Sequence, residues 1–339
     1  MITLNTEELR RDFAPAWFAR GPHAQTVLGR LIRPRTQVRL ERERLETPDG
    51  DELVLDHLAA RGPASLHVIL LHGLEGSSHS VYMQGVLSIL ARRGFSATAI
   101  NFRSCARDPK DISRMLPNRR PRFYHSGETG DLDFVVRTLR SRLPEARLVA
   151  FGASLGGNAL LKWLGEHPDQ NLISAAATIS VPYDLAVGAE YLERGAGPFY
   201  VARFLRTLKK KVKDVVERYP QVPVDLQTTM RSRTFREFDD AATAPLHGFK
   251  DASDYYARSS SIDYLGLIRT PTLCINAEDD PFLPREVLAR ARATASPSVE
   301  LLVTERGGHT GFISGSAPWN CVYWAEELVV EWLGANIRS

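Results

Sequence analysis

Short apolar runs alternate with amphipathic stretches over most of the chain after residue 66. The apolar runs cover residues 67–73, 96–101, 147–152, 174–180 and 271–277. The amphipathic stretches cover residues 80–93, 130–142, 155–166, 285–295 and 319–336. Apolar runs of about four to eight residues between helical stretches are typical of parallel strands that helices bury on both faces. The pattern predicts an α/β fold with a mostly parallel central sheet.

Two segments ahead of this region have a different pattern. Residues 38–47 and 52–60 flank the turn Pro48-Asp49-Gly50, and apolar and charged residues alternate in the first of them. A turn of this composition between two such segments favours an antiparallel pair. We expect this pair to form a half-exposed edge of the sheet.

The alternation of strands and helices is interrupted once, between residues 185 and 269. Within this interval, residues 204–220 place apolar residues on one face of a helix, and Lys209–Lys211 are expected mainly on the solvent side. A long insertion after a strand is a candidate lid over a site at the strand ends. The predicted divisions are an N-terminal arm (1–37), an α/β core (38–182 and 262–339) and a helical cap or lid (183–261).

Composition and charge exclude several classes of protein. Hydrophobic residues make up 43% of the chain and the formal net charge is only +3, which does not favour a nucleic-acid partner. The three cysteines have no metal-ligand spacing. The N-terminus lacks the apolar core of a signal peptide, and no apolar run reaches the ~18–20 residues of a membrane span. We expect a cytoplasmic protein, with a peripheral membrane contact left open.

Ser154 lies in the sequence RLVAFGASLGGNALLKWLGEH, where an apolar run passes through Gly-Ala-Ser-Leu-Gly into a helix. The pattern G-x-S-x-G between a parallel strand and a helix is typical of a nucleophile held on a sharp, strained turn. Gly152 and Gly156 stand where bulkier side chains would clash. The pentapeptide alone could be an ordinary tight turn, but its position in the predicted sheet favours a catalytic nucleophile.

A serine nucleophile needs a base and an acid, which in this arrangement follow it as Asp or Glu and then His. Of the histidines after Ser154, His309 follows a strand in a glycine-flanked loop, whereas His167 ends a helix and His247 lies in the insertion. We therefore expect His309 to be the base. The acid is expected at Asp280 in NAEDDPFLP, with Asp279 bracing the loop and Asp184 as the rival acid.

The oxyanion of acyl transfer needs hydrogen-bond donors. We expect the backbone N–H of Leu155, directly after the nucleophile, and that of Leu74, in the loop after the first buried strand. His72 and His79 have no third or fourth ligand at matching spacing, so we expect no metal. Neither a G-x-G-x-x-G nor a Walker motif occurs, so we expect no nucleotide cofactor.

With these residues placed, the sequence resembles the α/β-hydrolase superfamily and, within it, the YheT-like branch, also called the AB hydrolase 4 family. The resemblance covers nearly the whole chain and rests on PHAQT (22–26), HGLEGSSHSVY (72–82), INFRSC (100–105), FYHSGETGDL (123–132), GASLGGN (152–158), TAPLHGFKDASDYY (243–256), NAEDDPF (276–282) and GGHTGF (307–312). One departure is Ser104 with Ala106, where members tend to read Arg-Gly-Cys-Ser-Gly. The resemblance implies the charge-relay residues Ser154, Asp280 and His309.

The residues and the resemblance together predict a serine carboxylesterase that cleaves short- to medium-chain acyl esters through an acyl-enzyme. The expected partner is a small or lipid-like acyl ester. A thioesterase, an amidase or an acyltransferase would use the same three residues, and a catalytically silent scaffold that binds a partner is the alternative of a different class. Chain length of the acyl group, the alcohol and the oligomeric state stay open.

Overall fold

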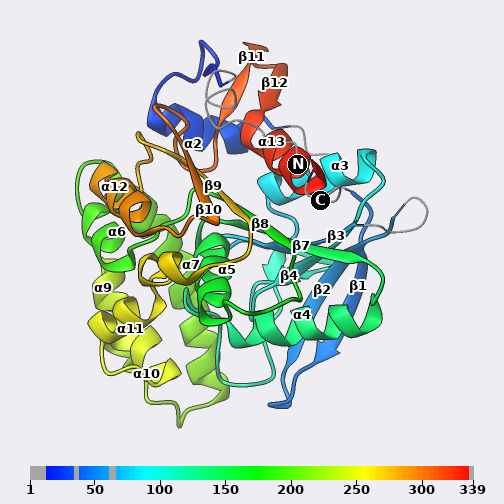
Figure 1. Ribbon diagram of the computed structural model, residues 1–339. Coiled ribbons are helices and arrows are strands. Elements are labelled where there is room, and N and C mark those ends of the chain that lie inside the picture. The colour runs from blue at the N-terminus through cyan, green and yellow to red at the C-terminus, as the bar shows by residue number, and fades with distance from the viewer. Residues whose placement is uncertain (1–12, 34–37, 61–65, 336–339) are drawn as a thin grey trace.

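The computed structural model describes residues 13–33, 38–60 and 66–335 (Figure 1). Of the predicted N-terminal arm, residues 1–12 and 34–37 lie outside the described residues. An eight-stranded sheet with the order β1-β2-β4-β3-β7-β8-β9-β10 forms the centre. Its strands are β1 (Glu41–Glu46), β2 (Glu52–Leu58), β3 (Leu66–Leu71), β4 (Ser96–Asn101), β7 (Arg147–Ala153), β8 (Ala175–Ile179), β9 (Thr272–Ala277) and β10 (Val299–Thr304).

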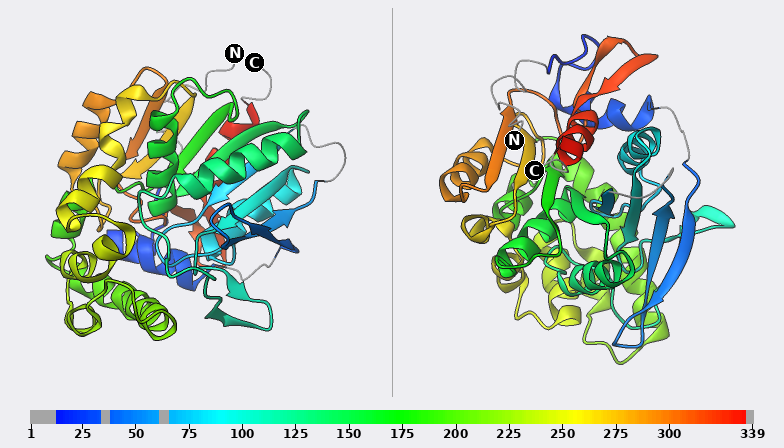
Figure 2. Two further views of the ribbon diagram at one scale, coloured as in Figure 1. Left: turned by 90° about the horizontal axis from the view of Figure 1, so that it is seen from below. Right: turned by 45° about the vertical axis from the view of Figure 1, so that its right-hand side comes forward.

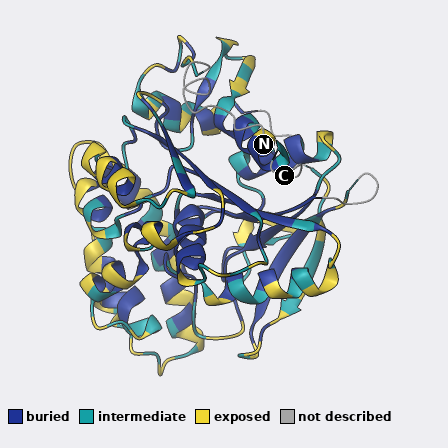
Figure 3. Cartoon of the chain, in the orientation of Figure 1, coloured by how far each residue is buried: buried dark blue, intermediate teal, exposed yellow. Residues whose placement is uncertain are grey.

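The sheet is parallel from β4 to β10, and β2 pairs antiparallel with both β1 and β4. The expected mostly parallel sheet with an antiparallel edge is thus confirmed. The inner strands are almost entirely buried, as the dark blue ribbon of Figure 3 shows. Burial on both faces explains why these strands read as continuous apolar runs rather than as alternating ones.

Two layers of helices cover the sheet. On one face lie α3 (Val81–Arg92) and α13 (Trp324–Ala335), whose apolar side chains share a hydrophobic cluster with the strands. On the other face lie α4 (Gly130–Arg142), α5 (Leu155–Glu166) and α12 (Arg285–Thr294). Each of these helices was expected from the spacing of its apolar residues, and the layered arrangement buries those residues against the sheet.

Three elements differ from the sequence-based expectation. Residues 22–31, which have no clear periodicity, form helix α2 (Pro22–Leu31) with a proline in its first turn. The predicted helix over residues 319–336 begins only at Trp324, because β12 (Asn320–Tyr323) pairs with β11 (Ile313–Ala317). A further hairpin, β5 (Arg107–Asp108) with β6 (Asp111–Met115), follows β4 and was not predicted.

The inserted segment, residues 183–261, is built of short helices around one long one. Its elements are α6 (Leu185–Tyr191), α7 (Gly197–Arg218), α8 (Leu226–Arg231), α9 (Phe235–Phe238), the π-helical turn η1 (Asp239–Thr243), α10 (Ala244–His247), α11 (Ala252–Ser259) and the first residue of the 3-10 turn η2 (Ser261–Asp263). A second 3-10 turn, η3 (Leu265–Leu267), leads to β9. Figure 2 shows the yellow-green helices of this segment gathered together on one side of the molecule. The division of the chain into arm, core and cap stays a prediction.

Helix α7 buries one face, and this face contradicts one expectation. Val201, Leu205, Leu208 and Val212 recur at helical spacing and form the hydrophobic cluster of the inserted segment. Lys210 is exposed, as expected for the lysine run, but Lys211 is buried. The prediction that this run faces mainly solvent is therefore wrong for Lys211, which lies on the same helix face as Leu208 and Val215.

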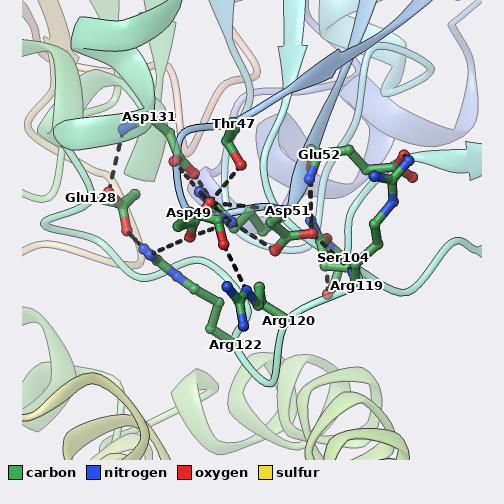
Figure 4. A network of polar contacts seen from close by, with 12 residues as sticks. Thr47, Asp49, Asp51, Glu52, Ser104, Arg119, Arg120, Arg122, Glu128 and Asp131 are labelled. Carbon is green, nitrogen blue, oxygen red and sulfur yellow. Dashed lines mark hydrogen bonds and ion pairs between the residues drawn. The ribbon is translucent and has the colours of Figure 1, made fainter.

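A buried charge network fixes the connection after β4 (Figure 4). The Arg103 guanidinium contacts Asp51 at 2.6 Å and Asp131 at 2.7 Å, and Asp49 at 3.1 Å. A buried guanidinium needs such partners, because removing it from water without them is costly. The network joins the turn between β1 and β2 to the start of α4. It holds the neighbouring Ser104, whose φ of 63° is in the left-handed region.

Among the described residues, no helix combines the length and the apolar character needed to cross a bilayer.

Candidate active site

Ser154 lies on the sharp turn between β7 and α5. Its backbone has a φ of 53°, which a residue with a side chain adopts only under strain. A Cβ atom on Gly152 would lie 2.6 Å from the carbonyl oxygen of Gly156, and one on Gly156 would lie 2.5 Å from that of Leu71. Both glycines therefore permit the close approach that this turn requires, and the turn directs Ser154 away from the sheet.

His309 and Asp280 meet Ser154 from two further strand ends. His309 Nε2 lies 2.9 Å from Ser154 Oγ, and His309 Nδ1 lies 2.9 Å from Asp280 Oδ2. Asp280 follows β9 and is 2% exposed, while His309 follows β10. In this arrangement Nδ1–H donates to the carboxylate, so Nε2 is free to accept the serine proton. The structure brings together the three side chains that the sequence singled out.

The other candidate acids have different contacts. Asp279 accepts a hydrogen bond from the backbone N–H of Gly308 at 2.9 Å, so it braces the loop that carries His309. Asp184 accepts from Val187 N–H at the start of α6 and pairs with Arg290 at 2.8 Å. Asp184, the rival acid, is thus a helix cap that does not contact His309.

The other candidate histidines also lie elsewhere. His167 ends α5, where its Nδ1 contacts the carbonyl oxygen of Trp163 at 2.9 Å. His247 lies in α10 with its ring 4.7 Å from that of His125. Burial lowers the pKa of His247 well below its ordinary value, so this side chain is neutral. Neither contacts Ser154.

The loop after β3 packs against Ser154. A Cβ atom on Gly73 would lie 3.0 Å from Ser154 Cβ, and Leu74 follows directly. Neither Leu74 N–H nor Leu155 N–H donates to another described residue. Their use as oxyanion donors stays a prediction.

His72 stabilises this loop as a neutral side chain. Burial lowers its pKa to about 3. Its Nδ1 contacts the carbonyl oxygen of Gly73 at 2.8 Å, and its Nε2 accepts from Phe102 N–H at 3.1 Å. The described residues contain no cluster of three or more His, Cys, Asp or Glu side chains suited to a metal ion.

A cavity of about 690 Å³ opens beside Ser154, between the strand ends and the inserted segment. Phe282 stacks on the His309 ring at 4.1 Å between centroids, and Tyr200 of α7 contacts Phe282 at 5.0 Å. Apolar side chains from α6, α7 and α9 form much of the wall, including Leu185, Phe204, Leu208 and Phe235, and Leu192 directly after α6 adds to it. The inserted segment therefore forms one side of the space next to the nucleophile.

The model of one protein family, the alpha/beta hydrolase fold, matches residues 67–316. The chain belongs to the α/β-hydrolase family. The protein YheT of Escherichia coli (strain K12) is 35% identical over 97% of this chain and 94% of its own length. Mouse phospholipase ABHD3 is 31% identical over 91% of this chain and 74% of its own length. The predicted membership of the YheT-like branch is confirmed.

Solved structures have the same fold at low sequence identity. The esterase Pf2001 of Pyrococcus furiosus matches with a TM-score of 0.53 and 17% identity, over 90% of this chain and 96% of its own. The structure of DcsB with its substrate analogue matches with a TM-score of 0.57 and 13% identity, over 89% of this chain and 100% of its own. These matches confirm the fold class.

Helix α2 contains the motif PHAQT, for which no role was predicted, and places it against the histidine loop. Thr26 Oγ1 accepts from His309 N–H at 2.9 Å, and Gln25 Oε1 accepts from Ile313 N–H at 2.6 Å. A Cβ atom on Gly308 would lie 2.5 Å from the carbonyl oxygen of Pro22. The helix thus braces the histidine loop. The only signal available in the sequence was the presence of PHAQT among the motifs that carry the family resemblance.

Lys211 of α7 reaches the loop that carries Leu74. Its Nζ lies 2.5 Å from Glu75 Oε1 and 3.1 Å from Cys105 Sγ, and 4.9 Å from the centre of the Tyr124 ring. Burial by itself would lower the pKa of Lys211, but Cys105 and Glu75 raise it above the ordinary value. Lys211 is therefore charged, and its ion pair ties the inserted segment to the loop beside Ser154.

Asp239 is a second buried ionisable group of the inserted segment, and it lines the cavity. Its carboxyl group accepts from Thr243 Oγ1 at 2.6 Å and from the Tyr256 hydroxyl at 2.7 Å. Burial raises its pKa to about 7, although both hydroxyl groups act in the opposite direction. Asp239 lies on a π-helical turn, a local structure that is frequent at functional sites.

Proposed function

We propose that this protein is a serine hydrolase that cleaves carboxylic esters through an acyl-enzyme. The observation that carries the proposal is the contact of 2.9 Å between Ser154 Oγ and His309 Nε2, with Asp280 on the other ring nitrogen. The names of two relatives support an ester as the bond cleaved: mouse phospholipase ABHD3 and a yeast monoacylglycerol lipase, 31% identical over 72% of this chain.

In the first half-reaction, Ser154 Oγ attacks the ester carbonyl carbon while its proton passes to His309 Nε2. Asp280 holds the imidazole and stabilises its charged form. The N–H groups of Leu74 and Leu155 donate to the oxyanion, which is the state that this site must stabilise most. The bond between carbonyl carbon and alcohol oxygen then breaks, and the alcohol leaves with the proton from His309.

In the second half-reaction, water gives a proton to His309 and attacks the acyl-enzyme. The bond to Ser154 breaks, the serine regains its proton and the carboxylic acid leaves. The apolar wall of the 690 Å³ cavity suits short- to medium-chain acyl groups. The cavity, together with Ser154, His309 and Asp280, supports an ester with an apolar acyl group as the substrate.

Hydrolysis of p-nitrophenyl butyrate by the wild type and by Ser154→Ala tests this function. We expect the variant to lose activity with an unchanged circular dichroism spectrum. Ser174→Ala is the matched control, since Ser174 precedes β8 at the opposite end of the strands. Hydrolysis that persists in Ser154→Ala would contradict the proposal.

A further inference from the structure

Three arginine side chains from three separate elements line the cavity that contains Ser154. They are Arg30 at the end of α2, Arg107 of β5 and Arg203 of α7. Helix α2 contacts α7 of the inserted segment, where His23 Nδ1 lies 2.9 Å from the Tyr200 hydroxyl oxygen. Burial and then the charges of Arg203 and Arg107 lower the pKa of Arg30, which agrees with the position of all three guanidinium groups on the wall of one cavity.

Among the described residues, none of these three guanidinium groups pairs with a carboxylate. Arg33 lines the same cavity but does pair with a carboxylate, that of Glu326 at 2.6 Å. The two carboxylates of the cavity wall are already engaged, Glu75 by Lys211 and Asp239 by two hydroxyl groups. The cavity therefore carries positive charge that no described carboxylate balances.

Arg30 and Arg203 are exposed, so they lie where the cavity opens to solvent. Exposed apolar side chains surround them, among them Leu31 next to Arg30 and Phe199 one turn before Arg203. An ester bound at Ser154 with its acyl chain against the apolar wall would direct its alcohol portion toward this opening. Guanidinium groups bind phosphate and carboxylate oxygens through paired hydrogen bonds.

We propose that Arg30, Arg107 and Arg203 form a subsite for an anionic group on the alcohol portion of the substrate. This inference rests on the proposed ester hydrolysis and narrows its substrate class to acyl esters of anionic alcohols. Phosphate, with a charge near −2 at neutral pH, balances three guanidinium groups better than a single carboxylate does. Phosphate and carboxylate groups both bind guanidinium through paired hydrogen bonds, and a matched set of esters distinguishes between them.

The test compares 1-butyrylglycerol 3-phosphate with 1-butyrylglycerol, because the reacting ester is the same in both and only the phosphate differs. At low ionic strength we expect kcat/KM to be about tenfold higher or more for the phosphate ester. In the variant R30Q/R107Q/R203Q this ratio falls to about one. Arg206→Gln, an exposed residue of α7 outside the cavity, keeps the wild-type ratio. A wild-type ratio near one, or a ratio that the triple variant keeps, would overturn the subsite.

O-butyrylglycolate, which carries a carboxylate instead, is the third substrate. Against neutral methyl O-butyrylglycolate, we expect it to show a smaller preference than the phosphate pair, and that preference also disappears in the triple variant. A preference for the carboxylate alone would overturn the assignment to phosphate.

Calorimetry on Ser154→Ala measures binding without turnover. We expect the phosphate ester to bind more tightly than the neutral ester, and the difference to vanish when the three arginines are also replaced. The binding measurement tests the subsite even if no ester is cleaved or if cleavage survives in Ser154→Ala. Either of these two results would contradict the proposed ester hydrolysis at Ser154 and not the subsite. Equal binding of both esters, together with loss of binding to phosphatidylglycerol vesicles in the triple variant, would assign the arginines to a membrane surface and overturn the subsite.

Discussion

The strand ends and the inserted segment hold their polar groups in different ways. At the strand ends, Ser154, Asp280 and His309 each follow a parallel strand, and they contact one another. In the inserted segment, Lys211 and Asp239 lie on helices, and the partner of Lys211 is Glu75, far away in the sequence. The sheet topology brings the first group together, whereas helix packing brings the second group to its partners.

The strand ends carry the candidate catalytic residues, whereas the inserted segment forms part of the cavity wall. Parallel strands end at the same edge of the sheet, so residues that follow them meet whatever the loops between them contain. A buried charge on an inserted helix is tolerated only where a group of opposite charge lies in contact with it. Replacing the strand-end residues should therefore abolish turnover. Replacing the buried ionisable residues of the inserted segment should change stability.

Asp280→Asn should have the largest effect among these tests. An asparagine keeps the shape but holds the His309 ring in the wrong tautomer, and we expect kcat to fall about 10⁴-fold. Steady-state hydrolysis of p-nitrophenyl butyrate measures this change. Asp184→Asn is the control and should keep kcat, because Asp184 caps α6. Equal losses in the two variants would contradict the assignment of Asp280.

Lys211→Met should have the next largest effect. The Lys211 and Glu75 side chains are 7% and 6% exposed, and loss of the cation leaves the Glu75 carboxylate buried without a cation, with the Tyr124 hydroxyl still donating to it at 3.0 Å. We expect the free energy of unfolding in urea to fall by about 3–5 kcal/mol. Lys210→Met, its exposed neighbour, should stay within about 0.5 kcal/mol of the wild type. Full stability of Lys211→Met would show that the ion pair does not hold the segment.

Thr26→Val should have a smaller effect, on the link between α2 and the histidine loop. Valine removes the acceptor for His309 N–H, and we expect a loss of about 1–3 kcal/mol of stability together with a lower kcat. Thr26→Ser retains the hydroxyl group and should restore both quantities. A serine variant as impaired as the valine variant would exclude the hydrogen bond as the cause.

Asp239→Asn should change the dependence of stability on pH rather than catalysis. The pKa of Asp239 is raised to about 7 in the folded state, whereas an unfolded aspartate has a pKa of about 3.9. The folded state therefore binds more protons between these values, and the wild type loses stability as pH rises from about 4 to 7. Thermal unfolding should show the asparagine variant gaining on the wild type between pH 5 and pH 8. A pH-independent difference would contradict the raised pKa.

The fold and the three strand-end residues could be predicted because their signals are local. The strand, G-x-S-x-G and helix of residues 147–166 are contiguous, and the order of Ser154, Asp280 and His309 follows from the fold. Helix α7 was expected from residue 204 but begins at Gly197, because Pro198 reads as a breaker although it fits the first turn of a helix. The inner strands contain no residue that could be interpreted in two ways like Pro198.

Contacts between distant parts of the chain could not be predicted. Thr26 and His309 are 283 residues apart, and nothing near Thr26 indicates its partner. Lys211 has the same neighbours in sequence as the exposed Lys210, and only the position of α7 against the loop after β3 distinguishes them. The raised pKa of Asp239 likewise depends on burial by helices that are separate in the sequence.

Covalent labelling with an alkyl fluorophosphonate tests the central claim most directly. This reagent phosphonylates an activated serine, and peptide mass spectrometry locates the adduct. We predict one adduct, on Ser154, formed in step with the loss of p-nitrophenyl butyrate hydrolysis and absent from His309→Ala. An adduct on a different serine, or complete hydrolytic activity in protein fully labelled at Ser154, would contradict the claim.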